Sequence, residues 1–187
     1  MRFRSAPCVA LVLAVGAGPA GAQFFSRGGN FTGAISVDVP SGDLASAARS
    51  GLGVLVRAET NQSGPWSLRT GLSFDRFSGK GSIDNLQFFT LLGGELVHRS
   101  GTRWYQYAGF GFYQSRTIVR PQPTVGGTAA PPATDRLNDF FDFGFQAGVG
   151  INYTLADTKT FVEFGFVNVL TIGPTSVWFP VRFGIRL

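Results

Sequence analysis

Apolar and polar side chains alternate one by one along much of this chain, and this alternation restricts its fold more than any other feature. From 141 to 153, every odd position is Phe, Ala, Val, Ile or Tyr, while the even positions from 142 hold Gly, Asp, Gln or Asn. The same period recurs at 52–59, 66–75 and 178–187. It is weaker at 31–39, 85–97, 104–117 and 160–170. Since successive side chains of a strand point to opposite faces, the pattern predicts eight strands of about 9–14 residues.

The face opposite the apolar side chains separates a soluble barrel from one that lies in a membrane. In water, this face would be rich in Lys, Glu and other long polar residues. Here it carries glycine and isolated charges, in a chain with 26 Gly and only 14% charged residues. Small residues beside single charges fit the narrow interior of an eight-stranded barrel. The other face carries Phe, Leu, Val and Ile without charges, as contact with lipid requires. We therefore predict an all-β fold: an eight-stranded antiparallel up-and-down transmembrane β-barrel.

The connections between these strands differ in length at the two ends. Short connections are expected at 61–65, 98–103 and 154–159, and equal or longer ones at 40–50, 78–84, 118–139 and 171–177. This alternation is typical of outer-membrane barrels, which have short periplasmic turns and longer outer loops. Within the first long connection, Ser41 or Asp43 could cap one helical turn.

The N-terminus has the features of an export signal. Arg2 and Arg4 precede an apolar stretch that ends in Ala20-Gly21-Ala22, an A-x-A site. We predict a signal peptide at 1–22 and a barrel domain at 23–187. The mature chain would lack cysteine and carry no further C-terminal domain, so that we expect no peptidoglycan anchor. The predicted location is the cell outer membrane.

Four segments resemble a known family. They are Pro40-Ser41-Gly42-Asp43-Leu44, Tyr107 to Tyr113, Phe161-Val162-Glu163-Phe164, and Phe179 to Leu187. The chain is similar in these to the outer-membrane-protein β-barrel domain, of the eight-stranded outer membrane protein A-like and opacity-type kind. The resemblance implies that the protein contacts outer-membrane lipid and lipopolysaccharide. It also implies that periplasmic chaperones and the barrel-assembly machinery bind the chain during transit. That machinery would recognise the lipid-facing stripe of the last strand: Phe179, Val181, Phe183, Ile185 and Leu187.

Charged residues on the inward side are the main candidates for a site. Both signs in a narrow, poorly hydrated space must pair, because an unpaired buried charge costs several kcal/mol. We therefore predict an ion-pair network that plugs the lumen; the alternative is a narrow gated channel. The residues concerned are Arg57, Glu59, Arg69, Glu95, Glu163, Arg182 and Arg186. Nearer the other end, Asp38, Asp75 and Asp142 could bind a cation, or pair with Arg76, Arg116 or solvent.

Other chemistry finds little support in the sequence. His98, the only histidine, lies at a predicted short turn on the periplasmic side, so we expect neither a Ser/His hydrolase nor any cofactor or zinc site. The arginines are scattered singly, which argues against nucleic acid. We expect a non-catalytic integral outer-membrane protein with a structural or cell-surface role, able to bind a surface ligand through 118–139. The main alternative is a secreted lipocalin-like carrier of a small apolar ligand.

Overall fold

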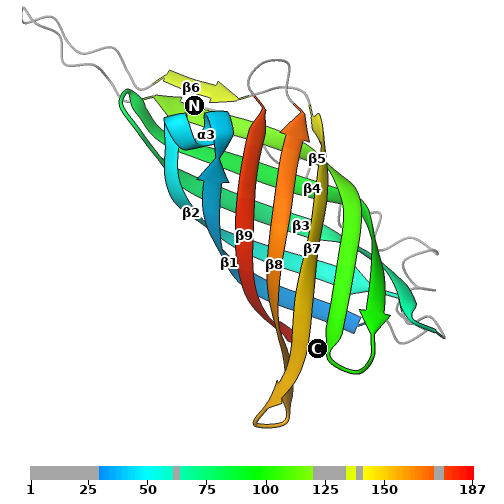
Figure 1. Cartoon of the computed structure of the whole chain (residues 1–187). Coiled ribbons are helices and arrows are strands. Elements are labelled where there is room, and N and C mark those ends of the chain that lie inside the picture. Colours follow the sequence, from blue (N-terminus) through cyan, green and yellow to red (C-terminus); the bar gives the residue numbers. More distant parts are fainter. Residues whose placement is uncertain (1–29, 61–63, 120–133, 138–140, 171–174) are drawn as a thin grey trace, which may run out of the picture.

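The chain forms one closed antiparallel β-barrel (Figure 1). The computed structural model describes residues 30–60, 64–119, 134–137, 141–170 and 175–187. The predicted signal peptide at 1–22 lies outside the described residues. The barrel strands are β1 (Asn30–Ser41), β2 (Ala48–Glu59), β3 (Trp66–Gly79), β4 (Ile83–Ser100), β5 (Trp104–Val119), β7 (Asp142–Leu155), β8 (Thr158–Leu170) and β9 (Ser176–Arg186).

Pairing of the first strand with the last closes the barrel. Each strand hydrogen-bonds to its neighbours in sequence, and β1 pairs with β9 from Thr32 opposite Arg186 to Ser41 opposite Val177. Closure leaves no unpaired edge among the eight described barrel strands, as hydrocarbon requires. The predicted eight-stranded up-and-down barrel is thus confirmed. No helix in the described part of the chain is long and apolar enough to cross a membrane.

The connections differ from the predicted pattern in three places. Two strands exceed the predicted 9–14 residues, β4 with 18 and β5 with 16, and β3 extends to Gly79. As a result, 78–84 is not a long loop: only 80–82 separate β3 from β4, in a tight turn that Gly81 permits with its φ of +60°. Residues 118–139 are not one open loop either, because β6 (Thr134–Leu137) pairs with the end of β5. Residues 120–133 and 138–140 of that connection lie outside the described residues.

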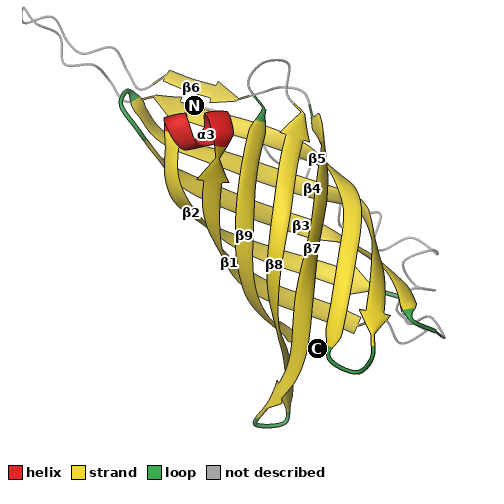
Figure 2. Cartoon of the chain, viewed as in Figure 1, coloured by secondary structure: helices red, strands yellow, loops and turns green. Residues whose placement is uncertain are grey.

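The first connection is a short helix, where the sequence indicated that one helical turn could form. Helix α3 (Gly42–Ala47) follows β1 directly, and β2 begins at the next residue (Figure 2). Ser41 occupies the N-cap position but makes no side-chain cap hydrogen bond. Helix α3 lies at the same end of the barrel as β6, whereas the C-terminus lies at the opposite end (Figure 1). We take the α3 end as the outer end, because the longer connections lie there.

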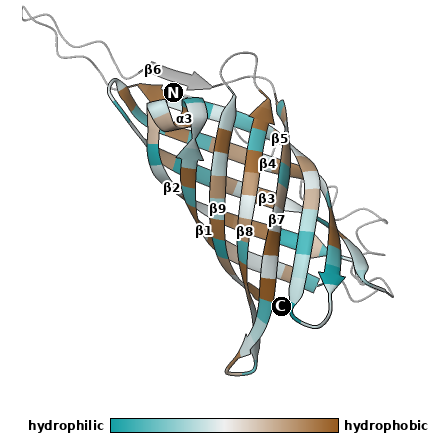
Figure 3. Cartoon of the chain, in the orientation of Figure 1, coloured by the Kyte–Doolittle hydropathy of each residue, from teal (hydrophilic) through white to brown (hydrophobic). Residues whose placement is uncertain are grey.

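The apolar face of the barrel points outward. In β2, Leu52 is 68% exposed and Val54 is 54% exposed, whereas Arg57 is 1% exposed and Glu59 is fully buried. Figure 3 shows the alternation of hydrophilic and hydrophobic residues along the strands. Aromatic side chains are exposed near the end of the barrel where the C-terminus lies (Trp66, Trp104, Tyr153). Others are exposed nearer the outer end (Phe112, Phe141). This surface is that of a protein with lipid around it and polar groups inside.

A bulge in β4 changes which residues of that strand face the lumen. Phe88, Thr90 and Leu92 are buried, but beyond the register shift between Leu92 and Gly94 the buried residues are Glu95 and Val97. One extra residue therefore moves the inward side from even to odd positions. Without it, Glu95 would point into lipid.

We expect a charge on the outward face of β9 to weaken the barrel. Phe183 is about half exposed and pairs with Ile35 of β1 and Val162 of β8. Phe183→Arg should lower the free energy of unfolding by about 2–4 kcal/mol, because a charge near the bilayer midplane loses its hydration. Denaturant unfolding in lipid vesicles measures the change. Thr102→Arg, in an exposed turn, is the control; equal unfolding midpoints for both variants would contradict an outward lipid face.

Candidate functional site

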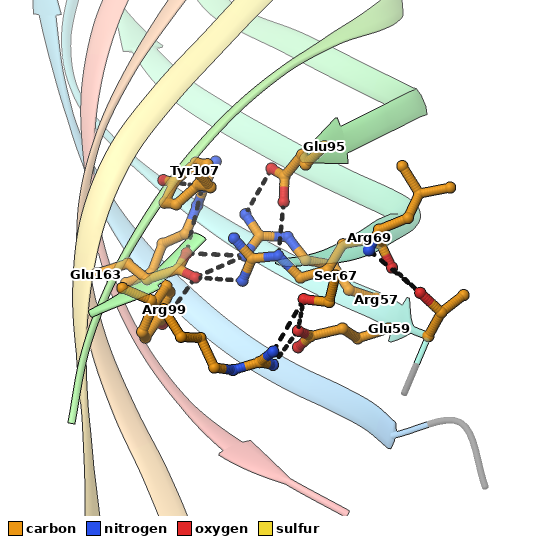
Figure 4. A network of polar contacts seen from close by, with 12 residues as sticks. Arg57, Glu59, Ser67, Arg69, Glu95, Arg99, Tyr107 and Glu163 are labelled. Carbon is orange, nitrogen blue, oxygen red and sulfur yellow. Dashed lines mark hydrogen bonds and ion pairs between the residues drawn. The ribbon is translucent and has the colours of Figure 1, made fainter. Parts of the chain in front are cut away.

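Five charged side chains from five strands meet inside the barrel, around Glu163 of β8 (Figure 4). Arg57 donates to both Glu163 oxygens, at 2.9 Å and 2.8 Å, and Arg69 donates to Oε1 at 2.8 Å. Arg182 lies 3.5 Å from Oε2. Tyr105 donates its hydroxyl to Oε1 at 2.9 Å. The Glu163 carboxylate is therefore held by three guanidinium groups and a hydroxyl.

Glu95 approaches the same arginines from the other side. It forms ion pairs with Arg57 Nη2 at 3.3 Å and with Arg69 Nε at 3.0 Å. The side chains of all four residues are almost completely buried. Two arginines thus lie between two glutamates, and each glutamate offsets the repulsion between the guanidinium groups.

Two tyrosines of β5 cover the arginines. The Arg69 guanidinium lies 4.8 Å from the centre of the Tyr107 ring and 5.4 Å from that of Tyr105, and Arg57 lies 5.4 Å from Tyr107. These are cation–π distances. Tyr107 also accepts a hydrogen bond from Arg182 Nη1 at 2.9 Å. The rings take the place of water around the charges.

Glycine on neighbouring strands makes the room that these large side chains need. A methyl group added at Gly150 would lie 2.5 Å from the Tyr105 hydroxyl, and one at Gly165 would lie 2.7 Å from the Tyr107 hydroxyl. Both distances are shorter than real carbon contacts. The inward glycines thus leave the space that the neighbouring charged and aromatic side chains occupy.

A second charged group lies nearer the C-terminal end. Glu59 accepts hydrogen bonds from Ser67 and Arg99, and Arg186 Nη2 lies 3.5 Å from its Oε2. The Glu59 side chain is fully buried, while those of Arg99 and Arg186 are partly exposed. This group lies between the Glu163 network and the opening of the barrel.

Aromatic residues fill the outer half of the lumen. Trp178 contacts Phe77, Phe88 and Tyr113, with ring centres 5.0–6.0 Å apart. Leu44 of α3 packs against the same buried cluster. The interior is therefore occupied at two levels: by apolar rings beneath α3, and by ion pairs below them.

The seven charges predicted to face the lumen all do so, in two groups. The structure brings Arg57, Arg69, Glu95, Glu163 and Arg182 together, and places Glu59 with Arg186. Arg99, Tyr105 and Tyr107 also belong to these groups and were not predicted from the sequence. Continued alternation from Glu95 and Val97 could have found Arg99, and the inward parity of 105 and 107 could have found the tyrosines.

Of the acidic residues nearer the outer end, for which the sequence left a cation or arginine partners open, two lie together in the lumen. Asp38 and Asp75 are buried and lie close enough for a side chain at Gly53 to touch both carboxylates. Ser73 donates to Asp75 at 3.0 Å. Arg76, a suggested partner, is exposed on the opposite face, because neighbouring residues of a strand point in opposite directions. Among the described residues, no group of three or more His, Cys, Asp or Glu could hold a metal ion.

His98 contacts residues of the neighbouring strands. Its ring centre lies 4.4 Å from that of Trp66, and Nδ1 lies 3.4 Å from Gln106 Nε2. It belongs to β4 rather than to the turn that the sequence suggested. The contacts are those of a residue packed at the barrel end.

A closed eight-stranded barrel with an apolar exterior and charged interior is the structure of an outer-membrane β-barrel protein. Among solved structures, the chain is similar to Ail of Yersinia pestis in complex with the heparin analogue sucrose octasulfate, with a TM-score of 0.58 and 11% identity. The match covers 85% of this chain and 97% of that one. It is also similar to Neisserial surface protein A, with a TM-score of 0.55, 14% identity, and coverage of 86% and 96%. These likenesses show a common fold. No protein-family model and no curated protein sequence matches the chain.

We expect removal of the Glu163 charge to destabilise the barrel. Glu163→Gln keeps the shape of the side chain but leaves three arginines with one fewer anion, so the free energy of unfolding should fall by about 3–5 kcal/mol. The control is Asp157→Asn, an exposed charge in a turn, which should change it by less than about 1 kcal/mol. Denaturant unfolding of both variants in vesicles measures the difference. Equal values would mean that the network does not hold the strands together.

Proposed function

We propose that this protein is a sealed, non-catalytic outer-membrane barrel that serves as a scaffold at the cell surface. The observation that carries the proposal is the lumen itself, where five mutually paired charges and a separate aromatic cluster occupy the cross-section at different levels. Eight strands enclose only enough space for side chains. The interior thus contributes stability, and interactions with partners fall to the outer surface.

A carrier of small apolar ligands would need the opposite arrangement of residues. Its interior would be apolar and its surface polar. Here Glu95, Glu163 and Arg57 are buried, and Leu52 and Val54 are exposed. The distribution supports a membrane barrel over the lipocalin-like alternative.

The plug can be tested by conductance, because a narrow gated channel remains the competing function. In planar lipid bilayers, the wild-type protein should produce no stepwise current. Since the two filled levels lie in series, Trp178→Ala alone or Arg69→Ala alone should also stay closed. Only the double variant should conduct. Its folding is checked by slower migration on a gel after boiling than before. Stable wild-type steps would overturn the plug and favour the channel.

We also propose a surface-interaction role for the outer end. Support comes from α3 and β6, which extend the barrel there beyond simple turns. The structure of Ail with sucrose octasulfate shows that a barrel of this fold can be a ligand-binding surface. The proline- and glycine-rich connection 118–139 is the segment that we assign to this role. Deleting 122–131 should abolish binding to a cell-surface ligand without changing heat-modifiable folding; unchanged binding would exclude the segment.

The outward stripe of β9 is our proposed signal for barrel assembly. Phe183, Ile185 and Leu187 are all exposed, and β9 pairs with both β8 and β1. Deletion of 181–187 should leave the protein degraded or in the periplasm, because the barrel cannot close. The measurement is the fraction of heat-modifiable protein in isolated outer membranes. Arg103→Ala is the control, and wild-type assembly of the truncated chain would contradict the proposal.

Residues 1–22 are our proposed export signal. The mature protein should begin at Gln23, and the intact mass of protein from outer membranes tests this. Retention of Met1 in membrane-inserted protein would contradict it.

A further inference from the structure

The outward face of β3 changes from apolar to basic between Phe74 and Arg76, near the outer end of the barrel. Across β2, β3 and β4, the row Val54, Phe74, Phe89 is in register and apolar. The next outward row towards α3 is Leu52, Arg76, Gln87, Arg116. This register marks the level at which the surrounding lipid changes from acyl chains to headgroups.

An open groove of about 750 Å³ lies at this level. Its charged lining consists of Arg49, Arg76, Lys80 and Asp84, with Ser50 and Ser78 between them. Three cations thus face one carboxylate. Asp84 already accepts a hydrogen bond from Asn85 Nδ2 at 2.9 Å. The groove therefore has a net positive charge.

The backbone positions two of these cations. The register of β2 against β3 shifts between Ala48 and Gly51, and this bulge leaves both Arg49 and Ser50 exposed. Lys80 donates to the carbonyl of Ala45 in α3, which holds its ammonium group beside the helix. Within the described ranges, Arg49 and Arg76 form no ion pair with another residue. Both are available to an external anion.

We propose that this groove binds the phosphate groups of a glycolipid headgroup in the outer leaflet. The proposal rests on the outer-membrane orientation taken above. Clustered arginines and a lysine bind phosphate through charge-assisted hydrogen bonds. The same lipid would lay its acyl chains on Val54 and Phe74, one row below Leu52 at the edge of the groove. A soluble polyanion would contact the cations alone, whereas a glycolipid contacts the cations and the adjoining apolar surface with one molecule.

The test compares lipid A with its dephosphorylated form on purified, folded protein. Native mass spectrometry of detergent-solubilised barrels measures the affinity for each lipid. The variant Arg49→Gln/Arg76→Gln/Lys80→Gln should bind lipid A about 100-fold more weakly than wild type, since each cation near a headgroup contributes about a fivefold factor. Dephosphorylated lipid should bind both proteins equally weakly.

Matched controls separate this site from general charge and from the other proposals. Arg103→Gln/Lys159→Gln, at the opposite end, should bind lipid A as wild type does. Equal lipid A affinity for the groove variant would overturn the site. Tighter binding of sucrose octasulfate than of lipid A, lost in the same variant, would overturn the lipid in favour of a soluble polyanion. The sealed lumen is tested separately by bilayer conductance. A negative lipid-binding result would therefore overturn the groove proposal without deciding whether the lumen is sealed.

Discussion

The carboxylate of Glu163 is the interaction on which the interior of the barrel depends. It is fully buried, and its partners come from β2, β3, β5 and β9. A buried charge without partners is strongly destabilising, so these strands must lie close around it. Arg182 lies directly opposite Glu163 in the β8–β9 pair, and closure of β1 on β9 brings Arg57 of β2 within reach. The hydrogen bonds of the sheet and the ion pairs of the lumen therefore require the same arrangement of strands.

Polar interior and apolar exterior follow from a single physical condition. In a bilayer, the medium around the protein already accommodates apolar side chains, and the barrel gains little by burying them. Backbone polar groups must all be paired, which the closed sheet achieves. The lumen then has to accommodate charges at close range. It does so with large side chains such as Arg57 and Tyr107 beside glycines such as Gly165, which leave space for them.

The two ends of the barrel differ in the side chains that they carry. At the C-terminal end, Glu59 with Arg99 and Arg186 forms a partly exposed group of charges at the opening. At the outer end, α3 packs Leu44 over the aromatic cluster around Trp178. The outer surface beside α3 carries the basic groove, directly above apolar strand residues. The similarity to Ail and Neisserial surface protein A concerns the fold. The arrangement of charges is described from the residues of this chain.

The alternation of side chains was sufficient to predict the eight barrel strands, their antiparallel order and the inward position of charges such as Arg57 and Glu163. In a regular strand a two-residue period determines which side chains share a face, which is why the two faces of β2 from Leu52 to Glu59 and of β7 from Phe143 to Tyr153 could be assigned. The pairing of Arg57 and Arg69 with both Glu95 and Glu163 could not be predicted, since it depends on which strands adjoin across the closed barrel and at what stagger. The bulges were also decided by tertiary structure. One extra residue near Gly93 brings Glu95 into the lumen, and another turns Arg49 towards the lipid, because register between neighbouring strands overrides the period of either strand alone.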